Sequence, residues 1–240
     1  MEDPDLNRAY DLRFKNPSSF LVAGATQAGK TTFTLNVLRN IDHLFEKPEC
    51  KWNVYYFYHE DQPGFALIAK EKIDNSDEPI VKQWFNRLPT TDDVEAIKEK
   101  SGDKGSIVII DDFAEDLTKD TVQIFTNKVH HKNCVVIVLT QNIFCKNPVF
   151  RTISLNCTYV VMFKNPRDGS QISCFAKQFA PRAGDWVVNA YEAATRFPHS
   201  YLMFDSHQQT ENVLRVRSHV LPNEFPMRVY RKKTLVKWLR

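Results

Sequence analysis

The sequence predicts an α/β protein with a mostly parallel sheet flanked by helices and with late antiparallel strands at its edge. Residues 107–110 and 134–139 are continuous apolar runs, which are typical of strands buried on both faces. Segments with helical spacing alternate with such runs, as in βαβ units. A glycine-rich loop at residues 24–31 also lies between a short apolar segment and a helical pattern, as the phosphate loops of α/β proteins do.

The first elements surround this loop. Residues 20–23, Phe-Leu-Val-Ala, predict a short buried strand before it. After it, a helix is predicted from apolar residues that share one helical face, namely Phe33, Val37, Leu38 and Ile41. Residues 54–58, Val-Tyr-Tyr-Phe-Tyr, predict a second strand because aromatic and β-branched residues favour strands.

Helices are expected between the later strands. We predict one over residues 78–88, ended by Pro89, one capped by residues 90–93 and running to residue 100, and one over residues 117–131. A fifth strand at 159–163 precedes helices around 169–179 and 184–195. Two late, more exposed strands follow at 201–204 and 213–216, and Arg215 and Arg217 share a face of the second.

The composition is that of a globular protein. With 240 residues, 42% hydrophobic and 25% charged, the chain is expected to form one large domain or one domain with a small appendage. We assign the domain to residues 1–222 and a basic C-terminal tail to residues 223–240. The net charge is only +3, so a surface that binds nucleic acid must be local.

The cysteines and the N-terminus indicate an intracellular protein. Five cysteines, an odd number and none in C-x-x-C spacing, are expected to be reduced thiols without zinc. The acidic start, Met-Glu-Asp-Pro-Asp, is no signal peptide. The longest apolar runs are too short to span a bilayer, so we expect no membrane association.

The loop matches the G-x-x-x-x-G-K-[ST] phosphate-binding pattern. Glycines permit a turn whose backbone N–H groups point inward, and the following helix start adds to this anion site. Lys30 would reach the β- and γ-phosphates, and the Thr31 hydroxyl would bind Mg²⁺. The alternative, a glycine-rich turn before an ordinary helix, is disfavoured by the matching strand and helix. The predicted nucleotide-binding residues are Gly24, Ala25, Thr26, Gln27, Ala28, Gly29, Lys30, Thr31 and Thr32.

Polar side chains at the ends of two more strands complete a candidate catalytic site. Asp111 follows the 107–110 strand and is placed to hold Mg²⁺ through water, while Asp112 could polarise the attacking water. Gln141 follows the 134–139 strand and could orient that water or sense the γ-phosphate. Ligands bind at the carboxyl ends of strands in such sheets. Without the loop, the two acids could equally cap the next helix.

The motifs of other classes of phosphate-loop protein are absent from this sequence. The nearest match to the guanine-binding N-K-x-D is Asn-Lys-Val-His at residues 127–130, without the acid. The L-S-G-G-Q signature of transporter ATPases is absent, and no arginine-rich lid typical of small-molecule kinases is found. These classes are therefore disfavoured.

Beyond these motifs, the chain resembles viral genome-packaging ATPases of the FtsK-HerA superfamily. It is most similar to the Polinton/Maverick and adintovirus type, with poxvirus packaging ATPases as more distant relatives. The resemblance runs from about residue 20 to about residue 222. It rests on the phosphate loop and on five further stretches, at residues 109–112, 130–133, 140–142, 151–156 and 163–168.

This resemblance implies a RecA-like P-loop ATPase core, a homo-oligomeric ring, and ATP-driven translocation of double-stranded DNA into a preformed capsid. It also implies a capsid or portal partner and a location at virus assembly sites in infected cells or with the virion. One departure is Asp112, where the superfamily more often has Glu. Glu115 could replace it only if the backbone turns back towards the site.

Two arginines could complete the site of a neighbouring subunit, as ring ATPases commonly require. We prefer Arg151, which follows the Gln141 strand most closely, over Arg167. An ordinary surface arginine or an ion pair within the chain is the alternative for each. At the C-terminus, basic and aromatic residues could contact DNA phosphates or dock another protein. They are Arg228, Tyr230, Arg231, Lys232, Lys233, Lys237, Trp238 and Arg240.

Two other functions remain open from the sequence. One is a different ATP-driven nucleic acid enzyme on the same core, such as a helicase or a DNA-transfer ATPase. The other is an ATP-binding ring component that hydrolyses little, which the shorter Asp112 side chain keeps open.

Overall fold

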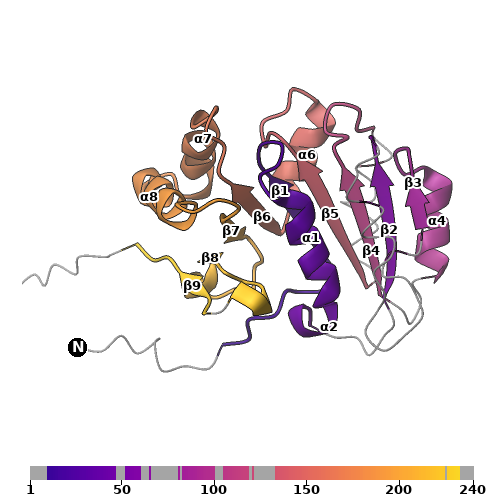
Figure 1. Cartoon of the computed structure of the whole chain (residues 1–240), viewed down its shortest axis with the longest axis horizontal. Helices are drawn as coiled ribbons and strands as arrows, with labels where there is room; N and C mark the ends of the chain where they lie inside the picture. The colour runs from indigo at the N-terminus through magenta and orange to yellow at the C-terminus, as the bar shows by residue number, and fades with distance from the viewer. Residues whose placement is uncertain are drawn as a thin grey trace, which may run out of the picture.

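The computed structural model describes residues 10–46, 52–60, 65, 81, 83–100, 105–118, 121, 133–224 and 226–232. Within them, nine strands form one sheet in the order β3-β2-β4-β5-β1-β6-β7-β8-β9 (Figure 1). The strands are β1 (Ser18–Ala23), β2 (Asn53–Tyr58), β3 (Gln83–Phe85), β4 (Ser106–Asp111), β5 (Cys134–Thr140), β6 (Tyr159–Phe163), β7 (Tyr201–Asp205), β8 (Val216–Ser218) and β9 (Arg228–Val229).

The sheet is mixed, as predicted. All pairings among β1 to β6 are parallel, and β7, β8 and β9 add to β6 as antiparallel strands. The continuous apolar strands β4 and β5 are buried along their whole length, because helices or other segments cover both faces.

The helices lie on both faces of this sheet (Figure 1). One apolar cluster joins one face to α1 and α2, and the other cluster joins the opposite face to α4, α6, α7 and α8. The helices are α1 (Lys30–Arg39), α2 (Ile41–Leu44), α4 (Thr91–Lys100), α6 (Pro148–Asn156), α7 (Ser170–Phe179) and α8 (Gly184–Ala194). None in the described part of the chain is long and apolar enough to cross a bilayer.

The strand order explains why two connections reach opposite faces. From β1 the chain runs through α1 towards β2, whereas from β5 it runs through α6 to β6 on the other side of β1. Crossovers between parallel strands are right-handed, so connections that run in opposite directions must cover opposite faces. The loops after β1, β4 and β5 therefore meet at one edge of the sheet, above its carboxyl ends.

The helix predicted over residues 78–88 is wrong in its described part, because Gln83–Phe85 form β3 beside β2. The ring of Trp84 stacks on Tyr56 at 4.9 Å between centroids, and the ring of Phe85 stacks on Phe57 at 4.6 Å. These cross-strand aromatic contacts outweigh the local helical preference. Most of the helix predicted over residues 117–131 lies outside the described residues.

Three smaller corrections concern helix and strand ends. The single helix predicted to include both Phe33 and Ile41 is two helices in the structure, because α1 ends at Arg39 and Ile41 begins α2. Helix α6 was not predicted, although Pro148 stands in its first turn and the Asn147 side chain accepts a hydrogen bond from Val149 N at 2.9 Å, both signals of a helix start. The strand predicted at 213–216 is mostly a 3₁₀ turn, Asn212–Leu214, and β8 begins only at Val216.

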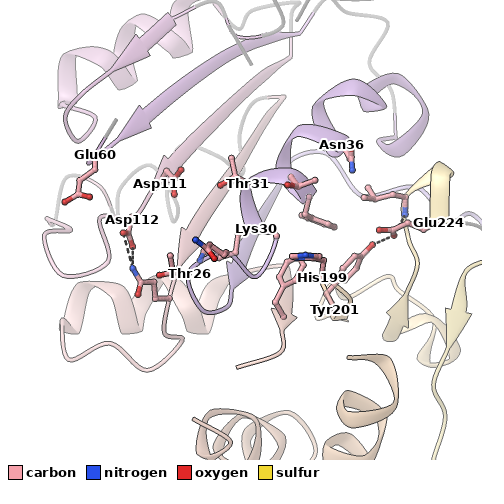
Figure 2. Close-up of a pocket in the computed structure, with 17 residues that line it drawn as sticks. Thr26, Lys30, Thr31, Asn36, Glu60, Asp111, Asp112, His199, Tyr201 and Glu224 are labelled. Carbon is pink, nitrogen blue, oxygen red and sulfur yellow. Dashed lines mark hydrogen bonds between the residues drawn. The ribbon is translucent and has the colours of Figure 1, made fainter. Parts of the chain in front are cut away.

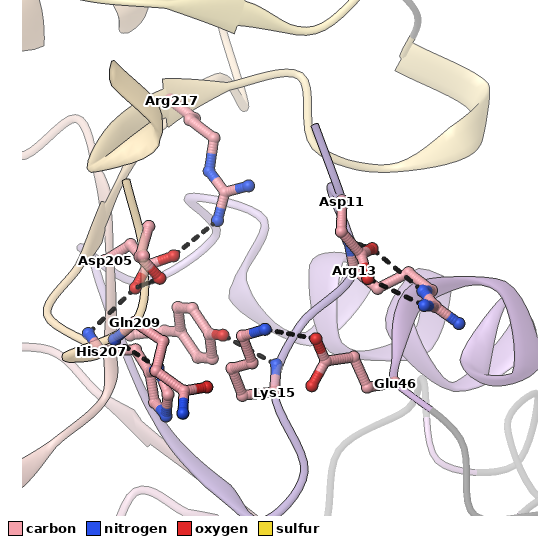
Figure 3. A network of polar contacts seen from close by, with 10 residues as sticks. Asp11, Arg13, Lys15, Glu46, Asp205, His207, Gln209 and Arg217 are labelled. Carbon is pink, nitrogen blue, oxygen red and sulfur yellow. Dashed lines mark hydrogen bonds and ion pairs between the residues drawn. The ribbon is translucent and has the colours of Figure 1, made fainter. Parts of the chain in front are cut away.

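The late strands β7 and β8 are buried, not exposed, because β9 and the connecting segments cover them. Arg217 on β8 donates from Nη2 to Asp205 Oδ2 at 2.8 Å, and both side chains are only 2% exposed (Figure 3). Burial raises the pKa of Asp205, and the charge of Arg217 lowers it. Burial lowers the pKa of Arg217, and the charge of Asp205 raises it. This ion pair ties β7 to β8 inside the fold.

Replacing Arg217 by Met should lower the free energy of unfolding by about 3–5 kcal/mol, because it leaves the buried Asp205 carboxylate without its partner. The pKa of Asp205 would then rise further. Protonation relieves the buried charge, so the loss should be smaller near about pH 5 than near about pH 8. Urea unfolding followed by circular dichroism at both pH values measures this.

Arg13→Met is the matched control, because Arg13 pairs with Asp11 at the surface, with side chains 48% and 44% exposed (Figure 3). It should leave the unfolding free energy nearly unchanged at both pH values. Equal losses in the two variants, or a loss in Arg217→Met that does not depend on pH, would contradict the role of the buried pair.

Candidate functional site

The loop between β1 and α1 has the geometry of an anion site. Gly24 N donates to Thr140 O at 3.2 Å, and Phe33 N donates to Gly29 O at 2.9 Å as α1 begins. A Cβ on Gly24 would lie 2.7 Å from the Cβ of Phe163, and Gly29 has a φ of 108°, so both positions require glycine. No side chain caps α1, which leaves its first N–H groups to a ligand.

Lys30 lies folded over this loop. Its Nζ donates to Gly24 O at 2.7 Å and to Ala25 O at 3.1 Å. Burial lowers the pKa of Lys30, while the charges of Asp111 and Asp112 raise it. A bound phosphate would stabilise the ammonium group further, so the loop and its lysine suit a phosphate ligand.

Asp111 lies at the end of β4 and is 3% exposed. Its Oδ2 accepts a hydrogen bond from the Tyr56 hydroxyl on β2 at 2.7 Å. Burial raises the pKa of Asp111; the Tyr56 hydrogen bond lowers it, the charge of Asp112 raises it, and Lys30 lowers it. The carboxylate is thus fixed in direction, and a cation beside it would relieve its burial.

Asp112 and Gln141 meet beside Asp111. Strand β5 lies between β1 and β4, so the residue after its end stands between the loop and the two acids. The Gln141 amide Nε2 lies 3.2 Å from Asp112 Oδ2 and 3.4 Å from Oδ1 (Figure 2). Asp112 has a φ of 63°, a turn that directs its side chain towards Gln141.

These residues line one cavity of about 780 Å³. In Figure 2, Lys30 lies near its middle, with Asp111 and Asp112 on one side and His199, Tyr201 and Glu224 on the other. Of the predicted nucleotide-binding residues, Thr26, Gln27, Gly29, Lys30, Thr31 and Thr32 line the cavity. The other three, Gly24, Ala25 and Ala28, supply loop backbone beneath it.

Both residues that we expected to hold Mg²⁺, Thr31 and Asp111, line the cavity. A hydroxyl and a carboxylate are oxygen ligands of the kind that Mg²⁺ takes, usually with phosphate and water oxygens in addition. Among the described residues, no group of three His, Cys, Asp or Glu side chains is arranged to hold a metal by itself. The donors present therefore fit an ion that is shared with a phosphate ligand.

Three further predicted residues do not line this cavity. Arg151 is exposed in the first turn of α6, and Arg167 is exposed between β6 and α7. Glu115 is exposed as well, beyond the Asp111 turn. Among the described lining residues, Lys30 is the sole Lys or Arg, against the carboxylates of Glu60, Asp111, Asp112 and Glu224.

Sequence reasoning missed the part of the cavity that comes from distant segments. Glu60 follows the end of β2, a strand-end position that could have been recognised. His199 and Tyr201 stand at the start of β7, which reaches the same edge because β7 is antiparallel to β6. His199 has a φ of 60°, and its Nδ1 lies 3.4 Å from Ala28 O. Only the strand direction, which no local pattern gives, places it against the loop.

No protein-family model and no curated protein matches this sequence. Among solved structures, the chain is similar to the crystal structure of B204, the DNA-packaging ATPase from Sulfolobus Turreted Icosahedral Virus. The TM-score is 0.52 at 13% identity, over 92% of this chain and 100% of that one. Since identity is so low, the similarity shows the fold alone, and it confirms the predicted α/β, RecA-like architecture.

Weaker similarities are found to two structures of EccC from Thermomonospora curvata. The structure of its ATPases 2 and 3 with a signal sequence peptide gives a TM-score of 0.40 at 12% identity, over 64% of this chain and 31% of that one. The cytoplasmic domain of this type VII secretion ATPase gives 0.38 at 12% identity, over 63% and 20%.

Replacing Tyr56 by Phe should raise the pKa of Asp111 further, because a hydrogen bond that favours the charged carboxylate is lost. Carbon-detected NMR titration of the Asp carboxyl groups measures this shift, with the Asp111 signal assigned from Asp111→Asn. Tyr58→Phe is the control, since Tyr58 lies on the same strand but makes no hydrogen bond to Asp111 within the described residues. An unchanged Asp111 titration in Tyr56→Phe would show that this bond does not set the pKa.

Proposed function

We propose that this chain is an ATP-driven motor that moves double-stranded DNA into a preformed viral capsid, as a member of the FtsK-HerA superfamily. The observation that carries the proposal is the single cavity that joins the phosphate loop, Lys30, Asp111, Asp112 and Gln141. The cavity belongs to a fold shared along the whole length of B204, which is itself a DNA-packaging ATPase. The Polinton and adintovirus packaging ATPases are the relatives that we infer from the sequence.

The residues of the site divide the work of hydrolysis. The loop N–H groups and Lys30 hold the β- and γ-phosphates. Thr31 and Asp111 hold Mg²⁺, which neutralises phosphate charge when bound. Asp112 polarises the attacking water and Gln141 orients it, after their mutual hydrogen bond opens. The Asp112 carboxylate is one methylene shorter than Glu, and its left-handed backbone is our reason for placing it within reach.

The charge balance of the cavity supports a ring. Its described lining offers Lys30 as the sole Lys or Arg against four carboxylates, so Lys30 is the one basic side chain that these residues set beside a triphosphate and its Mg²⁺. An arginine from a neighbour supplies a further positive charge in many ATPases. Arg151, exposed on α6, is our choice for this role, with Arg167 as the alternative.

The partners that we propose are double-stranded DNA and a capsid or portal protein, at virus assembly sites in the infected cell or with the virion. DNA would be held through its phosphates, by local basic residues. Of the basic residues proposed at the C-terminus, Arg228, Arg231 and Lys232 lie among the described residues, on or just after β9. That residues 223–240 act as a separate basic tail stays a prediction.

Turnover of ATP with and without double-stranded DNA tests this function. The wild-type chain should hydrolyse ATP with Mg²⁺ and be stimulated by DNA. Lys30→Ala should abolish hydrolysis and most ATP binding, whereas Asp112→Asn should bind ATP but turn it over slowly. Lys164→Ala, an exposed lysine outside the cavity, is the control and should behave as wild type. Wild-type turnover in Asp112→Asn would move the water-activating role to another residue.

One observation favours a second candidate, an ATP-binding ring component with little hydrolysis. The two side chains that we assign to the attacking water are bonded to each other, with Gln141 Nε2 3.2 Å from Asp112 Oδ2. Tight ATP binding without turnover, with or without DNA, would support this candidate against the motor. Strand separation on a forked substrate would indicate a helicase instead.

Subunit mixing tests the trans-acting arginine. Arg151→Ala should keep ATP binding but lose on the order of 10³–10⁵ in turnover, the typical contribution of such a group. Mixed with Lys30→Ala, which has an inactive loop but an intact Arg151, it should regain partial activity in shared rings. If mixed rings form, as shown by cross-linking, and stay inactive, Arg151 does not act across the interface, and Arg167→Ala is tested in the same way.

A further inference from the structure

The cavity extends well beyond the phosphate loop, away from the acids. Phosphates held by the loop and by Lys30 fill its middle, and the side towards Asp111 and Asp112 belongs to the terminal phosphate. The rest of a nucleotide must therefore extend in the opposite direction, towards Tyr201 and Glu224 (Figure 2). We call this part, lined by Phe33, Asn36, His199, Tyr201, Leu221 and Glu224, the distal arm.

The distal arm has an apolar floor. The ring of Phe33 packs edge-on against Tyr201 at 4.9 Å between centroids, and Phe163 packs against Tyr201 at 5.4 Å. Leu221, 1% exposed, closes the same wall. Apolar and aromatic linings with a few placed polar groups are typical of sites that bind small molecules and cofactors.

Two polar side chains at the rim are held in place by the fold. Glu224 Oε2 accepts hydrogen bonds from the Tyr201 hydroxyl at 2.5 Å and from Leu221 N at 3.4 Å. The other carboxylate oxygen makes no hydrogen bond within the described residues. Asn36 Oδ1 accepts from Arg39 Nη1 at 3.0 Å, which leaves the Asn36 amide N–H groups as donors. The rim thus offers an acceptor on the 222–224 turn and a donor on α1.

We propose that the distal arm is the nucleoside subsite and that the Glu224 carboxylate accepts a hydrogen bond from the nucleoside. The donor is either an amino group on a purine base or a ribose hydroxyl, and both present the same N–H or O–H chemistry. The inference rests on the proposed function, because it takes the phosphate position from the loop. It adds a specificity-determining residue that lies 194 positions after Lys30 in the chain.

The test compares wild type, Glu224→Gln and Asn36→Ala in calorimetric binding with Mg²⁺. The probes are ATP, dideoxy-ATP without both ribose hydroxyls, purine riboside triphosphate without the amino group, and inorganic tripolyphosphate. Glu224→Gln should weaken ATP binding roughly 10- to 100-fold, the effect of losing a hydrogen bond to a charged group. Tripolyphosphate binding should stay unchanged in both variants, because it reports only the loop.

The analogues identify the donor. For the analogue that lacks the donor group, the difference between wild type and Glu224→Gln should shrink to within about twofold. Asn36→Ala leaves the Glu224–Tyr201 hydrogen bond intact, so its selective loss of ATP affinity would support the subsite even if Glu224→Gln folds poorly. Glu192→Gln, an exposed carboxylate on α8 outside the cavity, is the matched control.

Two results would overturn the inference. One is equal ATP affinity in wild type, Glu224→Gln and Asn36→Ala. The other is a loss in Glu224→Gln that is the same for ATP and both analogues, which would mean that Glu224 only supports the turn. A wild-type chain that binds neither tripolyphosphate nor ATP would instead defeat the proposed function itself.

Discussion

The close approach of the loop backbone to Phe163 is the contact on which the site depends. At Gly24 a Cβ would stand 2.7 Å from the Cβ of Phe163, at the end of the neighbouring strand β6. Only a residue without a Cβ fits there, so the loop backbone lies close to the ends of β1 and β6. Lys30 can then reach back to the loop carbonyls, and α1 starts without a side-chain cap on its first N–H groups.

The sheet order converts this local contact into a shared site. Strand β5 lies between β1 and β4. The side-chain amide of Gln141, directly after β5, therefore lies between the loop and the two acids at the end of β4. The reversal of chain direction at β7 then brings a strand beginning, not a strand end, to the same edge. One side of the cavity is thus made by parallel strands and the other by antiparallel ones.

Much of this could be read from the sequence, because the informative patterns were local. The loop, Asp111, Asp112 and Gln141 follow apolar runs whose ends can be located from the residues alone, and the parallel core confirms those runs as β1, β4 and β5. What failed depends on contacts between distant segments. Gln83–Phe85 form a strand only because the rings of β2 lie beside them.

The same limit explains the buried Arg217 and the distal arm. An arginine near the end of a chain is usually solvated, and only its pairing with Asp205 across β7 and β8 accounts for its burial. Glu224 and Tyr201 are brought together by an antiparallel turn, which leaves no motif. Helix α6 is a different case, because Asn147 as N-cap and Pro148 in the first turn are local signals from which its start could have been predicted.

Both borders of the sheet, within the described residues, are short: β3 has three residues and β9 has two. Long, flat border strands offer open backbone groups to other chains and promote fibrous association. Here β9 begins with the exposed Arg228, and Gln83 is exposed at the opposite border. The protein can therefore be concentrated with little tendency to polymerise through the described borders of its sheet.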